Sequence, residues 1–376
     1  MLPHEIRSGK DLQRLQSLIC NLKEEFKDAG AIELELPALI DADVLIELYG
    51  EDLRARAFTV TNPFDGKQIL RPDFTVPVAQ KHIQSLQINQ RYCYSGPVWR
   101  YQGFGSRKSD EYYQVGLEIF HQDNAASFDA EVFKLINSAL SGYNLHCEIG
   151  DMGILRALVS ELDISGNKKS LLLRHLWRPD RFSQLLMHFS GEIASTVSRK
   201  ELLKSVKTRS LQDYIVSSGP IIGMRTVKDI VERAQELYNE ELSKPIPKTE
   251  VDLIHKIANL KCKFYESPDK LKQYSGLGGT FLSACENLNA RIEAMNFLGI
   301  EGPRFSFSTR LSRNTMEYYD SFVFSFFSNL YPELPPIAQG GRYDALTAVL
   351  NKKVNCPAVG GIIRPEILLN LTGRQQ

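Results

Sequence analysis

Hydrophobic and polar residues alternate in one stretch of the N-terminal half of this chain. The segment Tyr112–His121 has an apolar face and a mixed face, formed by Val115, Leu117 and Ile119 and by Gln114, Gly116, Glu118 and Phe120, respectively. The preceding segment, Tyr92–Gln102, is aromatic and apolar, and Gly96-Pro97 is expected to break it early. A polar loop, Gly103–Asp110, joins the two segments. This pattern predicts two strands of a long hairpin.

The mixed face of the hairpin carries candidate chemistry. Arg100, Gln114 and Glu118 are expected to share it, and Gly116 leaves room between the last two. A cation, an amide and a carboxylate together suit a small zwitterion. An ordinary hairpin with a solvated polar face gives the same pattern, and the alternation alone favours that plainer interpretation.

The rest of the N-terminal segment alternates between short helices and short strands. Apolar residues at helical spacing predict a helix between Leu12 and Phe26, which ends at Gly30. Pro72 and Asp73 are expected to open another helix. The other predicted elements are strands at 32–36, 58–60, 68–70 and 146–150 and helices at 42–48 and 127–140.

Composition changes after Asp151. Residues 151–299 are rich in Leu, Lys, Ser and Glu and predict a helical insertion domain. Strand character returns at 305–308, 322–327 and 358–361, with helices expected at 345–350 and 365–371. The chain is therefore predicted to fold as a core built from 1–150 and 300–376, interrupted by the insert.

Composition excludes several classes of protein. The 376 residues allow two or three domains, and 45 basic against 45 acidic residues argue against broad binding to nucleic acid. The six cysteines are scattered, so neither a metal site nor a redox pair is indicated. They fit a reducing cytoplasm. The N-terminus lacks a signal-peptide core, and no apolar run is long enough to cross a membrane.

Four separated stretches resemble the catalytic domain of histidyl-tRNA synthetase, a class II synthetase. They read ILRPDFT (69–75), GPVWRYQ and YYQVGLEIFH (96–121), EYYDSFVF (317–324) and GGRYDAL and AVGG (340–361). Their order and spacing match along nearly the whole chain. The resemblance implies an α+β fold, in which helices flank an antiparallel sheet, and a dimer formed through the segment around Pro37.

The resemblance also implies a pocket for L-histidine. Asp73 and Thr75 correspond to residues that hold the α-amino group, although Asp73 is one methylene shorter than the usual Glu. Glu118 would accept the imidazole N–H. The remaining candidates are Arg100 for the carboxylate, Gln114 for the backbone groups of the amino acid, and Tyr318 and Tyr319 beside the ring.

Departures from the synthetase pattern concern ATP. Gln102 stands where a Glu recognises adenine, and Ile367 replaces an arginine that clamps the phosphates. The catalytic arginine falls at Asn314, with Arg313 one residue early. Losing one such cation typically costs ~10²-fold or more in rate. Nine residues follow Ile367, so the anticodon-binding domain is expected to be absent.

A histidine pocket without ATP chemistry resembles the regulatory subunits of ATP phosphoribosyltransferase. Such subunits do no chemistry and need no cofactor or tRNA. They assemble with a short catalytic subunit, which needs them for activity, and take part in feedback inhibition by histidine. A divergent amino-acid ligase remains an alternative because Arg100 is retained. An RNA-binding module is a further alternative, which the neutral net charge disfavours.

Overall fold

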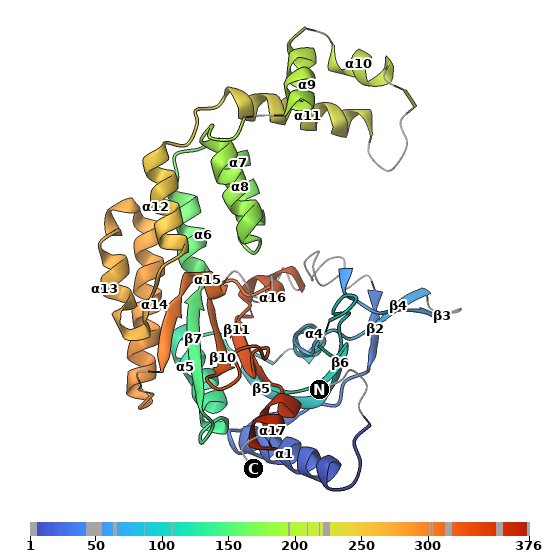
Figure 1. Ribbon diagram of the computed structural model, residues 1–376, viewed down its shortest axis with the longest axis vertical. Helices are drawn as coiled ribbons and strands as arrows, with labels where there is room; N and C mark the ends of the chain where they lie inside the picture. The colour runs from blue at the N-terminus through green and yellow to red at the C-terminus, as the bar shows by residue number, and fades with distance from the viewer. Residues whose placement is uncertain are drawn as a thin grey trace. The chain divides into compact units, whose positions relative to one another are not determined.

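The computed structural model (Figure 1) describes most of the chain. The described residues are 6–42, 55–62, 66–85, 87–106, 108–194, 196–208, 210–217, 219–220, 226–300, 302, 304–312, 318–350 and 356–373. The chain forms two compact units. The large unit comprises Met1–Ile154, Leu260–Gly276 and Leu282–Gln376, and the small unit comprises Leu155–Asn259 and Leu277–Phe281.

A mixed, mainly antiparallel sheet forms the centre of the large unit. Among the described residues it has nine strands, in the spatial order β1 (Ile32–Glu33), β5 (Gln90–Trp99), β6 (Glu111–Phe120), β12 (Ala358–Ile363), β11 (Ala338–Arg342), β10 (Phe322–Ser328), β7 (Leu145–Asp151), β9 (Phe305–Ser308) and β8 (Lys261–Lys263). The pairs β1–β5 and β7–β9 are parallel, and the other neighbouring pairs are antiparallel. The predicted antiparallel sheet flanked by helices is thereby confirmed.

Helices cover both faces of this sheet (Figure 1). The helices that lie wholly in the large unit are α1 (Gly9–Asp28), α4 (Thr75–Ser85), α5 (Ala125–Ala139), α13 (Ser267–Lys272), α15 (Thr309–Ser312), α16 (Asp344–Leu350) and α17 (Pro365–Gly373). On one face, Phe133 of α5 packs against the rings of Phe305, Phe322, Phe324 and Phe326. On the other face, α4 packs into a core that contains Phe74, Tyr94, Phe120 and Tyr343. Helices therefore bury apolar side chains on both faces of the sheet.

A second, small sheet contains the strands predicted at 58–60 and 68–70, together with β2 (Leu39–Asp41), which was not predicted. Its order is β2, β4 (Gly66–Leu70) and β3 (Thr59–Asn62). The strand predicted at 32–36 is β1 of the main sheet and is limited to Ile32–Glu33. The turn expected between β3 and β4 and most of the helix expected at 42–48 lie outside the described residues.

The predicted hairpin is confirmed as β5 and β6, but Gly96-Pro97 does not break the first strand. Gly96 pairs with Gln114, and Pro97 pairs with Tyr113. Backbone groups of every second residue of β5 point to the same side. Cys93 accepts from Leu34 N–H and Trp99 donates to the carbonyl of Arg71, so the backbone groups of these residues, and of Pro97 between them, face away from β6. The missing N–H of Pro97 therefore points to the side where β1 no longer pairs, and the ladder with β6 loses no hydrogen bond.

The small unit is built from helices. They are α7 (Gly166–Arg174), α8 (Pro179–Phe189), α9 (Val197–Thr208), α10 (Leu211–Ser217), α11 (Val227–Leu242) and α12 (Lys248–Ala258), while α6 (Met152–Glu161) and α14 (Gly279–Phe297) have residues in both units. Thr226 caps α11 in a reciprocal capping box with Asp229. Leu172, Phe182 and Leu186 are among its fully buried side chains.

The small unit ends earlier than the insert expected at 151–299. Residues 260–276 and most of α14 belong to the large unit instead. Two contacts explain this: β8 pairs with β9 in the main sheet, and Arg291 of α14 forms buried ion pairs with Asp129 and Asp151. Helical periodicity does not distinguish a helix of the insert from one packed on the core.

Candidate functional site

Glu118 of β6 lies at the centre of a buried polar cluster. Its side chain is 1% exposed, and three hydroxyl groups donate hydrogen bonds to it. Oε1 accepts from Thr75 Oγ1 at 2.8 Å and from Tyr94 OH at 2.9 Å, and Oε2 accepts from Tyr343 OH at 2.7 Å. The donors come from α4, from β5 and from the residue that follows β11. The carboxylate thus links three segments that are far apart in sequence.

Two glycines make room for this cluster. Gly360 pairs with Glu118 across β12 and β6, and a Cβ atom at Gly360 would lie 1.5 Å from Glu118 Oε2. Gly116 pairs with Tyr94, and a Cβ atom there would lie 2.6 Å from the tyrosine hydroxyl. The space predicted beside Gly116 is therefore present, and the hydroxyl of Tyr94 occupies it.

Burial controls the protonation of the cluster. It raises the pKa of Glu118 to about 7, although the three hydroxyl donors favour the ionised form. Burial also raises the pKa values of Tyr94 and Tyr343 well above 10, and the nearby Glu118 raises them further. Both phenols therefore stay protonated and donate, while Glu118 changes its charge close to neutral pH.

Asp73 and Arg100 form a second group beside Thr75. Asp73 lies just before α4 and is 3% exposed. Its Oδ2 accepts a 3.4 Å hydrogen bond from Tyr318 OH and lies 3.9 Å from Arg100 Nη2. The Arg100 side chain is fixed by a 2.7 Å bond from Nε to the carbonyl of Pro72. A buried anion and a buried cation thus lie side by side, with a hydroxyl between Asp73 and Thr75.

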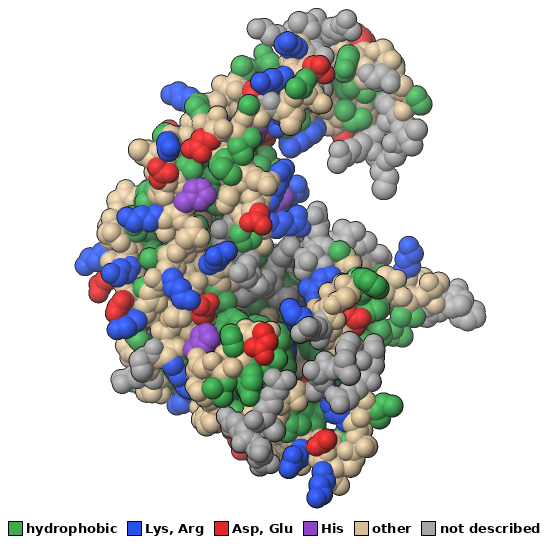
Figure 2. Space-filling view, in the orientation of Figure 1, with side chains coloured by type: hydrophobic (Ala, Val, Ile, Leu, Met, Phe, Trp, Pro, Cys, Tyr) green, Lys and Arg blue, Asp and Glu red, His purple; other side chains and the backbone are tan. Residues whose placement is uncertain are grey.

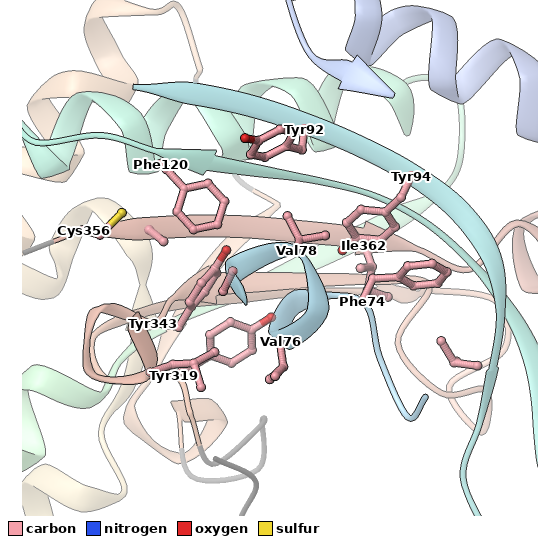
Figure 3. Packing of buried hydrophobic residues seen from close by; sticks show 14 of the residues in the cluster. Phe74, Val76, Val78, Tyr92, Tyr94, Phe120, Tyr319, Tyr343, Cys356 and Ile362 are labelled. Atoms are coloured by element: carbon pink, nitrogen blue, oxygen red, sulfur yellow. The ribbon is translucent and has the colours of Figure 1, made fainter. Parts of the chain in front are cut away.

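Gln114 and Tyr319 complete the predicted set. Gln114 is 1% exposed, and its Oε1 accepts no hydrogen bond from any described residue. Buried polar atoms are rarely left unsatisfied, so this acceptor is a candidate contact for a ligand N–H. Tyr319 is buried, with its ring 4.9 Å from that of Tyr318. In Figure 3, Tyr319 and Tyr343 both reach toward the turn of α4 that carries Val76 and Val78.

Two residues of the cluster were not among the predicted site residues. Tyr94 could have been found from the hairpin register, because it pairs with Gly116 and therefore shares the side of Glu118. No local pattern identifies Tyr343, since its hydroxyl reaches Glu118 only after β11 and β12 have paired with β6.

Arg364 and Gln102 both make contacts within the protein. Arg364 follows β12, is 8% exposed, and lies with its guanidinium carbon 5.6 Å from the centre of the Tyr112 ring. Its Nη2 donates to Gln339 Oε1 at 2.8 Å. Gln102 Oε1 accepts a 2.7 Å bond from Arg56 Nη2. Asn314 and Arg313 lie outside the described residues.

Among the described residues, no three or more His, Cys, Asp or Glu side chains are grouped so that they could hold a metal ion. Within the same ranges, every helix is too short or too polar to span a lipid bilayer.

Known proteins resemble this chain along nearly its whole length. A regulatory subunit of ATP phosphoribosyltransferase from Allorhizobium ampelinum is 27% identical over 90% of this chain and 93% of its own length. A protein of the same name from Sinorhizobium medicae is 24% identical over 95% of this chain and 97% of its own length.

Solved structures show the same fold. An ATP phosphoribosyltransferase regulatory subunit/histidyl-tRNA synthetase from Bacillus halodurans has a TM-score of 0.66 at 19% identity, over 98% of this chain and 82% of its own. A histidine–tRNA ligase subunit from Alicyclobacillus acidocaldarius has a TM-score of 0.62 at 20% identity, over 99% of this chain and 96% of its own. The family model described as histidyl-tRNA synthetase matches residues 7–210 and 223–368. The chain therefore belongs to the histidyl-tRNA synthetase family.

Proposed function

We propose that this chain is a regulatory subunit of ATP phosphoribosyltransferase and acts in the first step of histidine biosynthesis. It performs no chemistry of its own, and the short catalytic subunit requires it for activity. The names and nearly full-length coverage of its relatives support this assignment. The buried cluster around Glu118 carries the proposal, because it offers a small zwitterionic ligand a site within the protein interior.

L-Histidine fits the unsatisfied and titratable groups of this cluster. Glu118 would accept an imidazole N–H when its carboxyl is ionised, and with a pKa of about 7 this form predominates above neutral pH. Asp73 would pair with the α-ammonium group, and Arg100 with the α-carboxylate. The unpartnered Oε1 of Gln114 would accept a further N–H of the amino acid. Histidine would thus replace hydrogen bonds that these side chains make with one another.

The proposed lack of catalysis rests on residues at or near the positions where the synthetases bind ATP. Arg364 packs over Tyr112 and donates a hydrogen bond to Gln339, so its guanidinium is already engaged within the protein. Ile367 of α17 provides no cation for a phosphate. Adenylate formation depends on such cations, since negative charge develops on the phosphates.

A dimer through the segment around Pro37 is part of the proposal. Arg71 donates hydrogen bonds to the carbonyls of Leu36 and Pro97, and so ties this segment to the hairpin that carries the site. Nearby, Ile32 is 51% exposed and Leu39 is 39% exposed, as expected for side chains that a second copy covers. We place the chain in the cytoplasm with its partner, and propose no role in tRNA binding.

Calorimetry with L-histidine tests the pocket. Glu118→Ala is expected to weaken binding by ~1–3 kcal/mol, or about 5- to 150-fold, because the imidazole N–H loses its acceptor. Glu111→Ala is the matched control, since Glu111 lies exposed on the same strand. Unchanged affinity in Glu118→Ala, or no histidine binding by the wild type with or without its catalytic partner, would refute the pocket.

A ligase is the second candidate function, and the retained, buried Arg100 favours it. A ligase would catalyse histidine-dependent exchange of pyrophosphate into ATP. We expect no exchange above background, because Ile367 stands where the synthetases have an arginine that clamps the ATP phosphates. Clear exchange by protein free of contaminating synthetase, and its loss in Arg100→Ala, would favour the ligase instead.

A further inference from the structure

The small unit contains a cavity that the proposed function does not use. Its volume is about 450 Å³, within the range of small-molecule sites, and residues of α7, α8, α9 and α11 line it. All of its lining residues lie within 171–240, so it belongs to the small unit alone.

The lining of this cavity is cationic. Arg181, Arg199 and Arg233 line it, and Glu240 is the one acid among the lining residues, while Arg233 also pairs at 2.8 Å with Glu236 outside the lining. Arg181 and Arg233 are exposed and so stand at its opening, whereas Glu240 is only 3% exposed. Figure 2 shows Lys and Arg side chains gathered beside a His side chain in the region of α7 and α8. The opening therefore attracts an anion, while the interior offers an acceptor.

Two buried atoms of the cavity have unused hydrogen-bonding capacity. Among the described residues, Glu240 Oε1 and Arg199 Nε form no hydrogen bond, although Glu241 Oε2 lies 3.5 Å from the latter. The remaining contact between the two side chains is long, at 3.4 Å from Arg199 Nη2 to Glu240 Oε2. Leaving such groups unpaired costs free energy, so the cavity is suited to a ligand that brings both an N–H donor and an acceptor.

Flat side chains line the same cavity. Phe189, His175 and His188 contribute rings, and the centroids of His188 and Phe189 lie 6.0 Å apart. Leu185 and Leu237 add apolar surface. Stacking on such rings favours a planar heterocycle over an aliphatic ligand.

We propose that this cavity binds an aminopurine nucleoside monophosphate. The exocyclic amine donates to Glu240 Oε1, the base packs against the rings, and the phosphate contacts the arginines at the opening. A base with a carbonyl in place of the amine would present an acceptor to the Glu240 carboxylate and is rejected. This site is separate from the histidine pocket and does not depend on it.

Calorimetry of the full chain with adenosine 5′-monophosphate tests the proposal. We expect binding of this nucleotide, with inosine 5′-monophosphate and adenosine each at least about tenfold weaker, because the first lacks the amine and the second lacks the phosphate. Glu240→Gln is expected to weaken the adenine nucleotide and to remove the discrimination against inosine monophosphate, since an amide can donate to the carbonyl.

Arg233→Ala keeps the test decisive if Glu240→Gln does not fold. Arg233 is exposed, so its replacement should not disturb folding. The variant is expected to bind the nucleotide about tenfold more weakly than the wild type and to bind adenosine with unchanged affinity. Arg174→Ala, an exposed arginine of α7 outside the cavity, is the control, and Glu118→Ala should bind the nucleotide normally. The proposal is overturned if the wild type does not bind the nucleotide, if Arg233→Ala binds it unchanged, or if only a single-stranded RNA oligonucleotide binds.

Discussion

Replacing Asp129 with alanine is expected to lower the free energy of unfolding of the large unit by ~3–5 kcal/mol. Asp129 lies on α5 and is completely buried. Its Oδ2 lies 2.6 Å from Arg291 Nε, and its Oδ1 lies 2.7 Å from Arg342 Nη2. The two arginines are 5% and 2% exposed, so removal of the carboxylate leaves two buried cations with too little opposing charge.

The same substitution is expected to disturb the site, because Arg342 directly precedes Tyr343. Arg342 also contacts Asp344 Oδ1, the carbonyl of Ala125 and His121 Nε2, each at 3.0 Å. Burial and the nearby Arg342 lower the pKa of His121, so its neutral ring accepts from the guanidinium. Asp129 therefore fixes the backbone from which Tyr343 reaches Glu118, and histidine affinity should fall with stability.

Urea unfolding followed by circular dichroism measures this effect. Asp28→Ala is the control, because Asp28 is exposed at the end of α1, and surface substitutions usually change stability by less than ~0.5 kcal/mol. A loss of less than ~1 kcal/mol in Asp129→Ala would show that the buried ion pairs do not hold α5 and α14 to the sheet.

Replacing Glu118 with glutamine is expected to stabilise the protein at pH 8. Burial raises the pKa of Glu118 from 4.5 to about 7, a difference worth ~3 kcal/mol. Between these values the folded protein holds a proton that the unfolded chain has released. Wild-type stability therefore falls as pH rises from about 4.5 to 7 and then levels off. Glutamine stays neutral at every pH, so the stability of the variant does not fall in this way.

Chemical denaturation at pH 5 and pH 8 checks the prediction. The stability gained by Glu118→Gln should approach ~3 kcal/mol at pH 8 and shrink at pH 5, reduced by any hydrogen bond that the amide makes less well than the carboxylate. Glu111→Gln on the same strand should show no such pH dependence, because its side chain is exposed. Equal gains for Glu118→Gln at both pH values would contradict the account of the raised pKa.

Alternation along one strand predicted the hairpin and its two faces, but on its own it did not indicate a binding site. It placed Gln114 and Glu118 on one side of β6, and Gly360 and Ile362 of β12 were found to line the same side. The hairpin and its partners could be predicted because their signal is local, with a period of two residues. The assignment of Asp73, Thr75 and the two tyrosines to one pocket depended instead on resemblance to a family.

Long-range packing accounts for what the sequence did not reveal. The contact of Tyr343 with Glu118 and the network around Asp129 join residues more than 150 positions apart, and no periodic pattern encodes such pairs. The limit of the small unit was misplaced for the same reason. The packing of Arg364 on Tyr112 likewise depends on the fold, because β6 and β12 pair only in the folded sheet.

Activity of a mixed complex tests the central proposal most directly. Phosphoribosyl transfer by the short catalytic subunit should be measured alone, with this chain, and with this chain plus L-histidine, while light scattering follows assembly. We expect the subunit alone to be nearly inactive, the complex to be active, and histidine to inhibit it in the wild type but much less in Glu118→Ala. Full activity of the catalytic subunit alone, together with failure of the two proteins to associate at micromolar concentration, would contradict the assignment as a regulatory subunit.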